Sequence, residues 1–240
     1  LVTGFLVAAI GCSGEQGQQS AEKRAAAALA EAKQVNICIF LDLSDRIEPS
    51  IHASVPSHKE RDIEAVLTVV NYFRDEMKAR GAFFAKGKLK TIFSPAPSSP
   101  RINEIAQDLR VDLSTVKPEA KKKYFDELEM AYRNGLEETY SSVLESHQYV
   151  GADIWRFFQE GQVVDYCIDP DPSYANKLII LTDGYIYHDN SVEKRGNRTT
   201  YITGPLLQRE GLRSSNWSDK MDAGDYGLVD TPKITAPLSV

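Results

Sequence analysis

The chain has 240 residues, of which 42% are hydrophobic, and it carries a formal net charge of −6 at pH 7. This length and apolar content allow one sizeable core, and undivided α/β domains of this size are common. The acidic balance argues against a nucleic-acid-binding protein, which needs a basic surface against the phosphates.

The first twelve residues, LVTGFLVAAIGC, are apolar but too few to span a bilayer. They are typical of the hydrophobic part of an export signal, of which we expect only a remnant in residues 1–12. The last four, Ala9 to Cys12, resemble a bacterial lipobox, although Ala9 stands where leucine is commonest. This resemblance implies a lipid on Cys12 and a protein of the bacterial cell envelope, membrane-anchored and facing the periplasm or the exterior. A buried terminal element and a plain secretory signal are the alternatives.

Residues 13–33 follow as a polar tether and an alanine-rich helical spacer. We expect one folded domain over 34–240, with a loop-rich insertion at about 190–233 where Gly, Asn, Ser and charged residues dominate. The final ITAPLSV fits the start of another strand, so we expect the domain to be truncated at its carboxyl end.

Alternating strands and helices follow the spacer. Residues 35–41 are apolar on both faces of a strand, which is typical of a strand covered on both sides. A helix is expected from the capping box of Ser57 and Glu60 to Gly81. Next we expect a strand within 87–95, a helical turn, an edge strand near 109–113, a long helix from Pro118, a helix after Gly151 and a buried strand at 178–182.

This order predicts an α/β fold with a doubly wound, mostly parallel sheet and helices on both faces. We expect the strands at 35–41 and 178–182 to be parallel neighbours. Each is followed by an aspartate, Asp42 and Asp183 respectively. Ligands of such sheets bind beyond the carboxyl ends of the strands, so both carboxylates are expected where a ligand can reach them.

The stretches FLDLSDR and LIILTDG, about 140 residues apart, resemble the von Willebrand factor A (vWA) domain. That family is a Rossmann-like α/β sandwich with a metal-ion-dependent adhesion site. Its first motif, Asp-x-Ser-x-Ser, is matched by Asp42 and Ser44, and its last aspartate by Asp183. The stretch GADIW, with Asp153, occupies the place of a threonine-containing turn.

Two departures from the family pattern leave two candidates for the positive charge at this site, a divalent metal ion and an arginine. Arg46 stands where the motif has its second serine, and Ala152 where it has threonine. The resemblance still implies a Mg²⁺ or Ca²⁺ site with oxygens from Asp42, Ser44, Asp153 and Asp183, because these hard cations prefer such ligands. Alternatively, Arg46 folds back onto one of the carboxylates and substitutes for the metal with an ion pair.

Simpler structural interpretations exist for the same residues. Asp42 and Asp183 are also suited to strand-end turns, and Asp153 to capping the helix that follows it. Cys38 and Cys167 would form a disulfide in an oxidising compartment, but Cys38 lies in an apolar strand, where buried free cysteine is common.

Three functions remain open at this stage. The resemblance implies a non-enzymatic binding module that engages a protein partner at the carboxyl edge of the sheet through a degenerate metal-ion-dependent adhesion site. A haloacid-dehalogenase-like, Mg²⁺-dependent phosphatase is the second interpretation, although Ser44 stands where it needs its acid/base aspartate. A structural envelope protein with an inactive site is the third.

Overall fold

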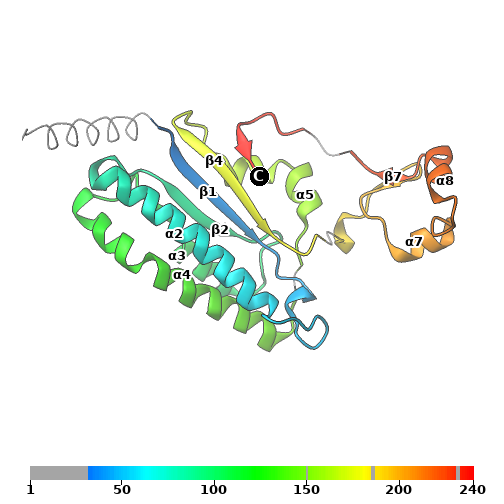
Figure 1. Ribbon diagram of the computed structural model, residues 1–240, viewed down its shortest axis with the longest axis horizontal. Helices are drawn as coiled ribbons and strands as arrows, with labels where there is room; N and C mark the ends of the chain where they lie inside the picture. Colours follow the sequence, from blue (N-terminus) through cyan, green and yellow to red (C-terminus); the bar gives the residue numbers. More distant parts are fainter. Residues whose placement is uncertain (1–31, 150, 185–186, 231–232) are drawn as a thin grey trace, which may run out of the picture.

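A computed structural model describes residues 32–149, 151–184, 187–230 and 233–240. The proposed signal remnant with Cys12, and nearly all of the tether and spacer, lie outside these residues. The core is a five-stranded sheet in the order β3-β2-β1-β4-β8 (Figure 1). All its neighbouring pairs are parallel except β2 and β3. Its strands are β1 (Gln34–Leu41), β2 (Lys88–Ile92), β3 (Val111–Asp112), β4 (Tyr174–Leu181) and β8 (Leu238–Ser239).

The centre of the sheet is the pair β1 and β4. They are parallel neighbours in register from Gln34 opposite Tyr174 to Leu41 opposite Leu181, which confirms the predicted pairing. The side chains of β1 are buried on both faces of the sheet, as their apolar pattern predicts. The first strand therefore ends deep inside the protein, at the same level as the end of β4.

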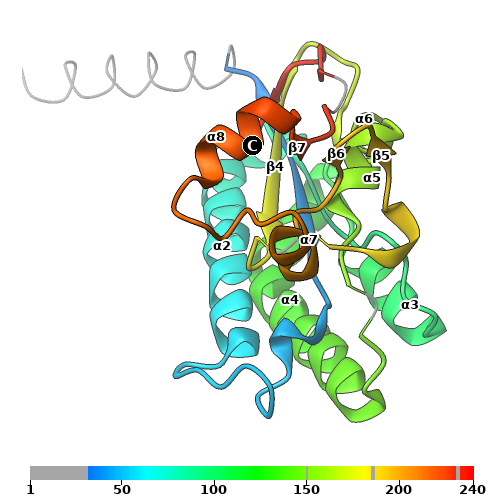
Figure 2. The ribbon, with the colours of Figure 1, turned by 90° about the vertical axis from the view of Figure 1, so that its right-hand side faces the viewer.

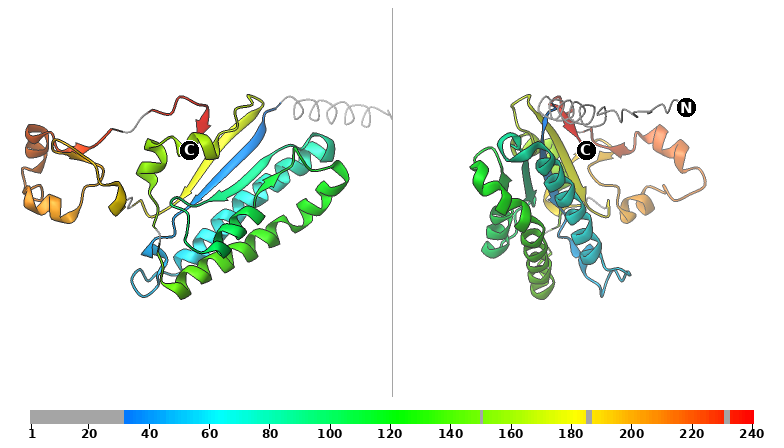
Figure 3. Two further views of the ribbon diagram at one scale, coloured as in Figure 1. Left: turned by 180° about the vertical axis from the view of Figure 1, so that it is seen from behind. Right: turned by 60° about the vertical axis from the view of Figure 1, so that its left-hand side comes forward.

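Three helices cover one face of the sheet: α2 (His58–Phe84), α3 (Pro100–Asp108) and α4 (Pro118–Ser146). The long helices α2 and α4 run side by side (Figure 3). The predicted capping box at Ser57 and Glu60 is present at the start of α2. Gly81 interrupts that helix with a φ of +75°, a value that glycine adopts without a steric cost.

Two short helices, α5 (Ile154–Gln159) and α6 (Gln162–Cys167), cover the other face (Figure 2). Phe40 of β1 packs edge-on against Phe157 of α5, with ring centroids 4.9 Å apart. A disulfide joins Cys38 of β1 to Cys167 at the end of α6, so the paired alternative for these cysteines is the one that the structure contains. This bond fixes α6 to the central strand.

The segment expected to be a loop-rich insertion contains short regular elements. A 3-10 helix, η2 (Asp189–Ser191), precedes a small three-stranded sheet. These elements and the two helices between them lie beyond the carboxyl ends of β1 and β4, to the right in Figure 1. They are β5 (Lys194–Arg195), β6 (Arg198–Thr199), α7 (Gly204–Arg209), α8 (Trp217–Gly224) and β7 (Gly227–Leu228).

Candidate functional site

Asp42 is buried at the point where β1 ends. Its Oδ1 accepts a hydrogen bond from the backbone N–H of Ser44 at 2.9 Å. Its Oδ2 accepts one from the hydroxyl of Thr182, also at 2.9 Å. Thr182 directly follows β4, so the parallel pairing of β1 with β4 brings the two side chains together. Both oxygens of the Asp42 carboxylate are therefore engaged within the protein.

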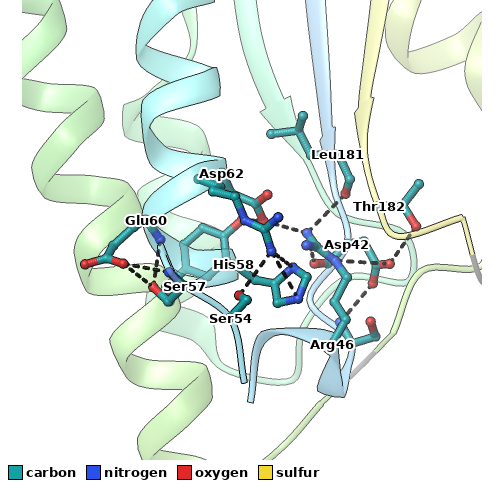
Figure 4. A network of polar contacts seen from close by, with 12 residues as sticks. Asp42, Arg46, Ser54, Ser57, His58, Glu60, Asp62, Leu181 and Thr182 are labelled. Atoms are coloured by element: carbon teal, nitrogen blue, oxygen red, sulfur yellow. Dashed lines mark hydrogen bonds and ion pairs between the residues drawn. The ribbon is translucent and has the colours of Figure 1, made fainter. Parts of the chain in front are cut away.

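Arg46 folds back under the end of the sheet from a short 3-10 helix, η1 (Asp45–Ile47). Its Nη2 donates to Oδ2 of Asp62 in α2 at 2.6 Å and to the carbonyl oxygen of Asp42 at 3.0 Å. Its Nε lies 3.5 Å from Oδ2 of Asp42. Residue Arg46 is only 3% exposed, and Figure 4 shows its guanidinium between the two carboxylates. This is the arrangement predicted by the ion-pair alternative, with a second carboxylate that the motif did not indicate.

The contacts within this cluster shift the pKa values of Arg46 and Tyr140. Burial disfavours the charge on Arg46, but the hydrogen bond and the negative charge of Asp62 outweigh burial, and the pKa of Arg46 is raised. The hydroxyl of Tyr140, in α4, donates to Oδ2 of Asp62 at 2.7 Å. Burial and the charge of Asp62 raise the pKa of Tyr140 well above its ordinary value, so this phenol remains a donor. One guanidinium and one neutral phenol thus lie against the two buried carboxylates.

Asp153 is buried in a separate polar cluster. Its Oδ1 accepts from the backbone N–H of Arg156 at 3.1 Å, which makes it the N-cap of α5, as the simpler interpretation predicts. Its Oδ2 accepts a hydrogen bond from the hydroxyl of Ser191 and lies 3.4 Å from Nδ1 of His188. The Asp153 carboxylate therefore connects α5 to the segment that follows β4.

Ser44 and Asp183 line an open hollow of about 840 Å³ at the carboxyl end of the sheet. An isolated β-bridge between Leu43 and Gly151 joins the loop after β1 to the loop before α5, and Gly151 also lines the hollow. We call this feature the carboxyl-end hollow, and its lining residues are Ser44, Asp45, His52, Tyr149, Gly151, Ala152, Asp183, Tyr187, His188, Asp189 and Asn190.

The four predicted metal ligands do not form one coordination set. Asp42 faces Arg46 and Thr182, Asp153 caps α5, and Asp183 lies at the hollow with Ser44. Within the described part of the chain, no group of three or more His, Cys, Asp or Glu side chains is placed to hold a metal ion. The residues as arranged thus do not fit the Mg²⁺ or Ca²⁺ that the family resemblance implies, because a guanidinium already lies against Asp42.

Sequence reasoning missed several members of the site. Asp62 is one of them: it adjoins the apolar stripe of α2, where charged residues are also typical of the solvated helix face, so the sequence does not reveal its contact with Arg46. Tyr140 lies in the apolar stripe of α4, where a tyrosine can be an ordinary core residue. Its hydrogen bond to Asp62 could therefore not be inferred from the sequence. Tyr149, whose hydroxyl donates to Glu48 at the rim of the hollow, lies in a loop with no periodicity to interpret.

The chain matches no protein-family model, no curated protein and no solved structure. Among the helices that the structure describes, none combines the length and apolar character needed to cross a membrane.

Proposed function

We propose that this chain is a lipid-anchored envelope protein whose vWA-like domain binds a protein partner at the carboxyl-end hollow. The proposal is based on two features at the carboxyl end of the sheet, a buried ion-pair cluster and an open hollow above it. Arg46 pairs with the buried carboxylates of Asp42 and Asp62 below the surface, while the loops after β1 and β4 and before α5 line a polar hollow above them. Such a surface can bind a partner without performing chemistry.

The vWA resemblance is supported by topology. Two parallel central strands are followed by Asp42 and Asp183, helices cover both faces, and a third loop reaches the first through Leu43 and Gly151. We propose that the domain is a doubly wound vWA-like sandwich with a degenerate adhesion site. In this site Arg46 provides the positive charge that a divalent ion would otherwise provide for Asp42.

Export is supported by the disulfide between Cys38 and Cys167. Disulfides persist in oxidising compartments such as the bacterial periplasm and are rare in the cytosol. This agrees with the lipobox-like residues Ala9 to Cys12, from which the proposed anchor derives. Both features are consistent with an envelope location that faces the periplasm or the exterior.

A site-specific photo-crosslinker tests the binding role. Placed at Asp189 in the hollow, it should give a discrete adduct in the expressing cells, whereas the same group at Glu104 on exposed α3 should not. Asn190→Trp, which fills the hollow, should remove the adduct, and Gln107→Trp on α3 should leave it. No adduct from Asp189, or equal adducts from both positions, contradicts the proposal.

Lipid attachment has its own test. Metabolic labelling with a fatty-acid analogue should mark the wild-type chain and not Cys12→Ala, because the cysteine thiol carries the lipid. Cys38→Ala is not a suitable control, since Cys38 is in a disulfide; Ser13→Ala, next to the proposed site, should label normally. Equal labelling of wild type and Cys12→Ala would rule out the anchor.

A further inference from the structure

We infer that the amino end of the sheet docks on an anionic membrane surface through Phe83 and Phe84. These adjacent side chains, at the end of α2, are 74% and 62% exposed. We call them, together with the exposed Lys33 and Lys86, the amino-end patch. The inference rests on the proposed envelope location and adds the orientation of the domain on the membrane.

A kink at Gly81 separates the two phenylalanines from the regular part of α2. Before the kink, Phe73 and Met77 point into the core and are 0% exposed. After it, both aromatic rings reach solvent, although phenylalanine is among the residues most often buried. Single exposed apolar side chains are ordinary, whereas neighbouring ones on one surface are typical of an interaction site.

Basic residues surround the two phenylalanines in the sequence. The stretch 77–90, MKARGAFFAKGKLK, has five Lys and Arg and no Asp or Glu, in a chain whose formal net charge is −6. Arg80 and Lys88 are engaged in ion pairs, whereas Lys86, two residues after Phe84, is exposed. The exposed rings are therefore accompanied by positive charge, which is attracted to anionic lipids.

A second ammonium lies directly behind the patch. The Nζ of Lys121, in the first turn of α4, donates to the carbonyl oxygen of Ala85 at 2.6 Å. Burial and the charge of Lys86 lower the pKa of Lys121, so the two ammonium groups repel each other. Of the nearby acids, Asp112 and Asp169 pair with Lys88. An anionic surface against the patch would relieve the repulsion.

The chain from the proposed lipid site joins the domain at this patch. Ala32 is the first residue that the structure describes, and its carbonyl oxygen accepts from Nη1 of Arg80 at 2.9 Å. Nε2 of Gln34 donates to the carbonyl oxygen of Phe84 at 3.0 Å. The segment that leads back to Cys12 therefore begins beside the two exposed rings.

This placement puts the anchor and the patch at the same end of the domain. The twenty residues from Cys12 to Ala32 reach at most about 70 Å, so a lipid on Cys12 keeps the patch near the membrane. Figure 1 shows the end of α2 and the beginning of β1 on the left, and α7 and α8 on the right. The carboxyl-end hollow lies beyond the other end of β1, roughly 25 Å away, and faces away from the membrane.

A membrane fits the patch better than a protein partner does. Two phenylalanines bury about 150–250 Å² each, whereas a stable protein interface buries about 800 Å² on each partner. A membrane requires no such matched area, because apolar side chains insert individually at the boundary between headgroups and acyl chains. Stable attachment also needs a second signal besides a lipid chain, and a basic surface is such a signal.

The test is sedimentation of the full chain carrying Cys12→Ala with lipid vesicles. This substitution removes the lipid site, so binding reports the protein surface alone. We expect vesicles of equal parts phosphatidylglycerol and phosphatidylcholine to bind the chain at least about tenfold more tightly than vesicles of phosphatidylcholine, at low ionic strength. Added salt should weaken the binding, because the attraction to the headgroups is screened.

A pair of double variants in the same background locates the apolar part of the contact. Phe83→Ser with Phe84→Ser should weaken binding to the anionic vesicles at least about tenfold, because two inserting side chains are lost. Ile51→Ser with Val55→Ser is the control. These residues are 59% and 102% exposed in the loop before α2, at the opposite end of that helix, and their replacement should leave binding nearly unchanged.

A second pair locates the charged part. Lys33→Gln with Lys86→Gln should remove the preference for phosphatidylglycerol. Lys194→Gln with Arg213→Gln changes the net charge equally at exposed positions beyond the carboxyl end of the sheet, and should keep the preference.

Three outcomes overturn the inference: no binding to the anionic vesicles, equal binding of the phenylalanine variant and its parent, or a dimer that the phenylalanine substitutions dissociate. The first two leave the proposed anchor standing, because the vesicle assay contains no lipidated protein. Conversely, if fatty-acid labelling fails while the vesicles bind as expected, the anchor is wrong and the amino-end patch stands.

Discussion

Arg46 explains why a buried strand can end in charged residues, because its guanidinium lies between Asp42 and Asp62. Replacing Arg46 with Ala leaves two buried carboxylates without a cation, and breaking buried pairs in this way costs about 3–5 kcal/mol. Arg101→Ala is the control, since its pair with Glu138 is exposed to solvent and its loss should change the stability little. Urea unfolding measures both. Equal losses in the two variants would mean that the buried cluster contributes no special stability.

The hydrogen bond between Glu48 and Tyr149, at the rim of the hollow, should make the stability of the protein depend on pH. Hydrogen bonds from Tyr149 and from Ser50 lower the pKa of Glu48 from 4.5 to about 2. A carboxyl whose pKa is lower in the folded state stabilises the fold above pH 4.5 and loses this contribution as the pH falls toward 2. Tyr149→Phe should therefore move the Glu48 pKa toward 4.5 and flatten that part of the stability profile. An NMR titration measures the shift. An unchanged Glu48 pKa in Tyr149→Phe would show that this hydrogen bond is not its cause.

At Gly135, helix α4 packs closely against α3 and the residue that follows it. A Cβ on Gly135 would lie 3.0 Å from Cγ2 of Ile105 and 3.1 Å from Cδ1 of Leu109. Gly135→Ala should gain about 1 kcal/mol of helix propensity but lose about 1–3 kcal/mol through overpacking, giving a less stable protein overall. Asn134→Ala, on the exposed side of α4, is the control and should be neutral or stabilising. Higher stability of Gly135→Ala in urea unfolding would show that α3 can move aside.

Most long elements could be predicted from sequence, because each has a local signal. The double-sided apolar run of β1, the capping box of α2 and Pro118 at the start of α4 place these elements correctly. The short helix α6 was missed, since six residues do not establish a period. In the site, Asp42 and Ser44 were indicated by the motif, whereas Asp62 reaches Arg46 only through the packing of α2 on the sheet. That contact is tertiary and has no local pattern.

At the scale of the whole molecule, the disulfide closes a chain segment 129 residues long between β1 and α6. Loop-closure entropy predicts that removing a bond over so long a loop costs up to about 5 kcal/mol. Reduction with dithiothreitol should therefore lower the melting temperature of the wild type by several degrees. Cys38→Ala with Cys167→Ala should melt near the reduced protein and show no response to the reductant. The stabilising role of the disulfide would be contradicted if the reductant left the melting temperature of the wild type unchanged although alkylation showed that both thiols were free.

We propose that Arg46, and not a divalent ion, provides the positive charge for Asp42. The most direct measurement is the melting temperature of the metal-stripped protein with and without saturating Mg²⁺ or Ca²⁺. A ligand at about 100 times its Kd stabilises the folded state by about 2.7 kcal/mol, which corresponds to roughly 5–10 °C in a domain of this size. If Arg46 provides the charge, the melting temperature of the wild type should change by less than about 1 °C, far short of that shift. A rise of several degrees that Asp42→Ala abolishes would contradict it.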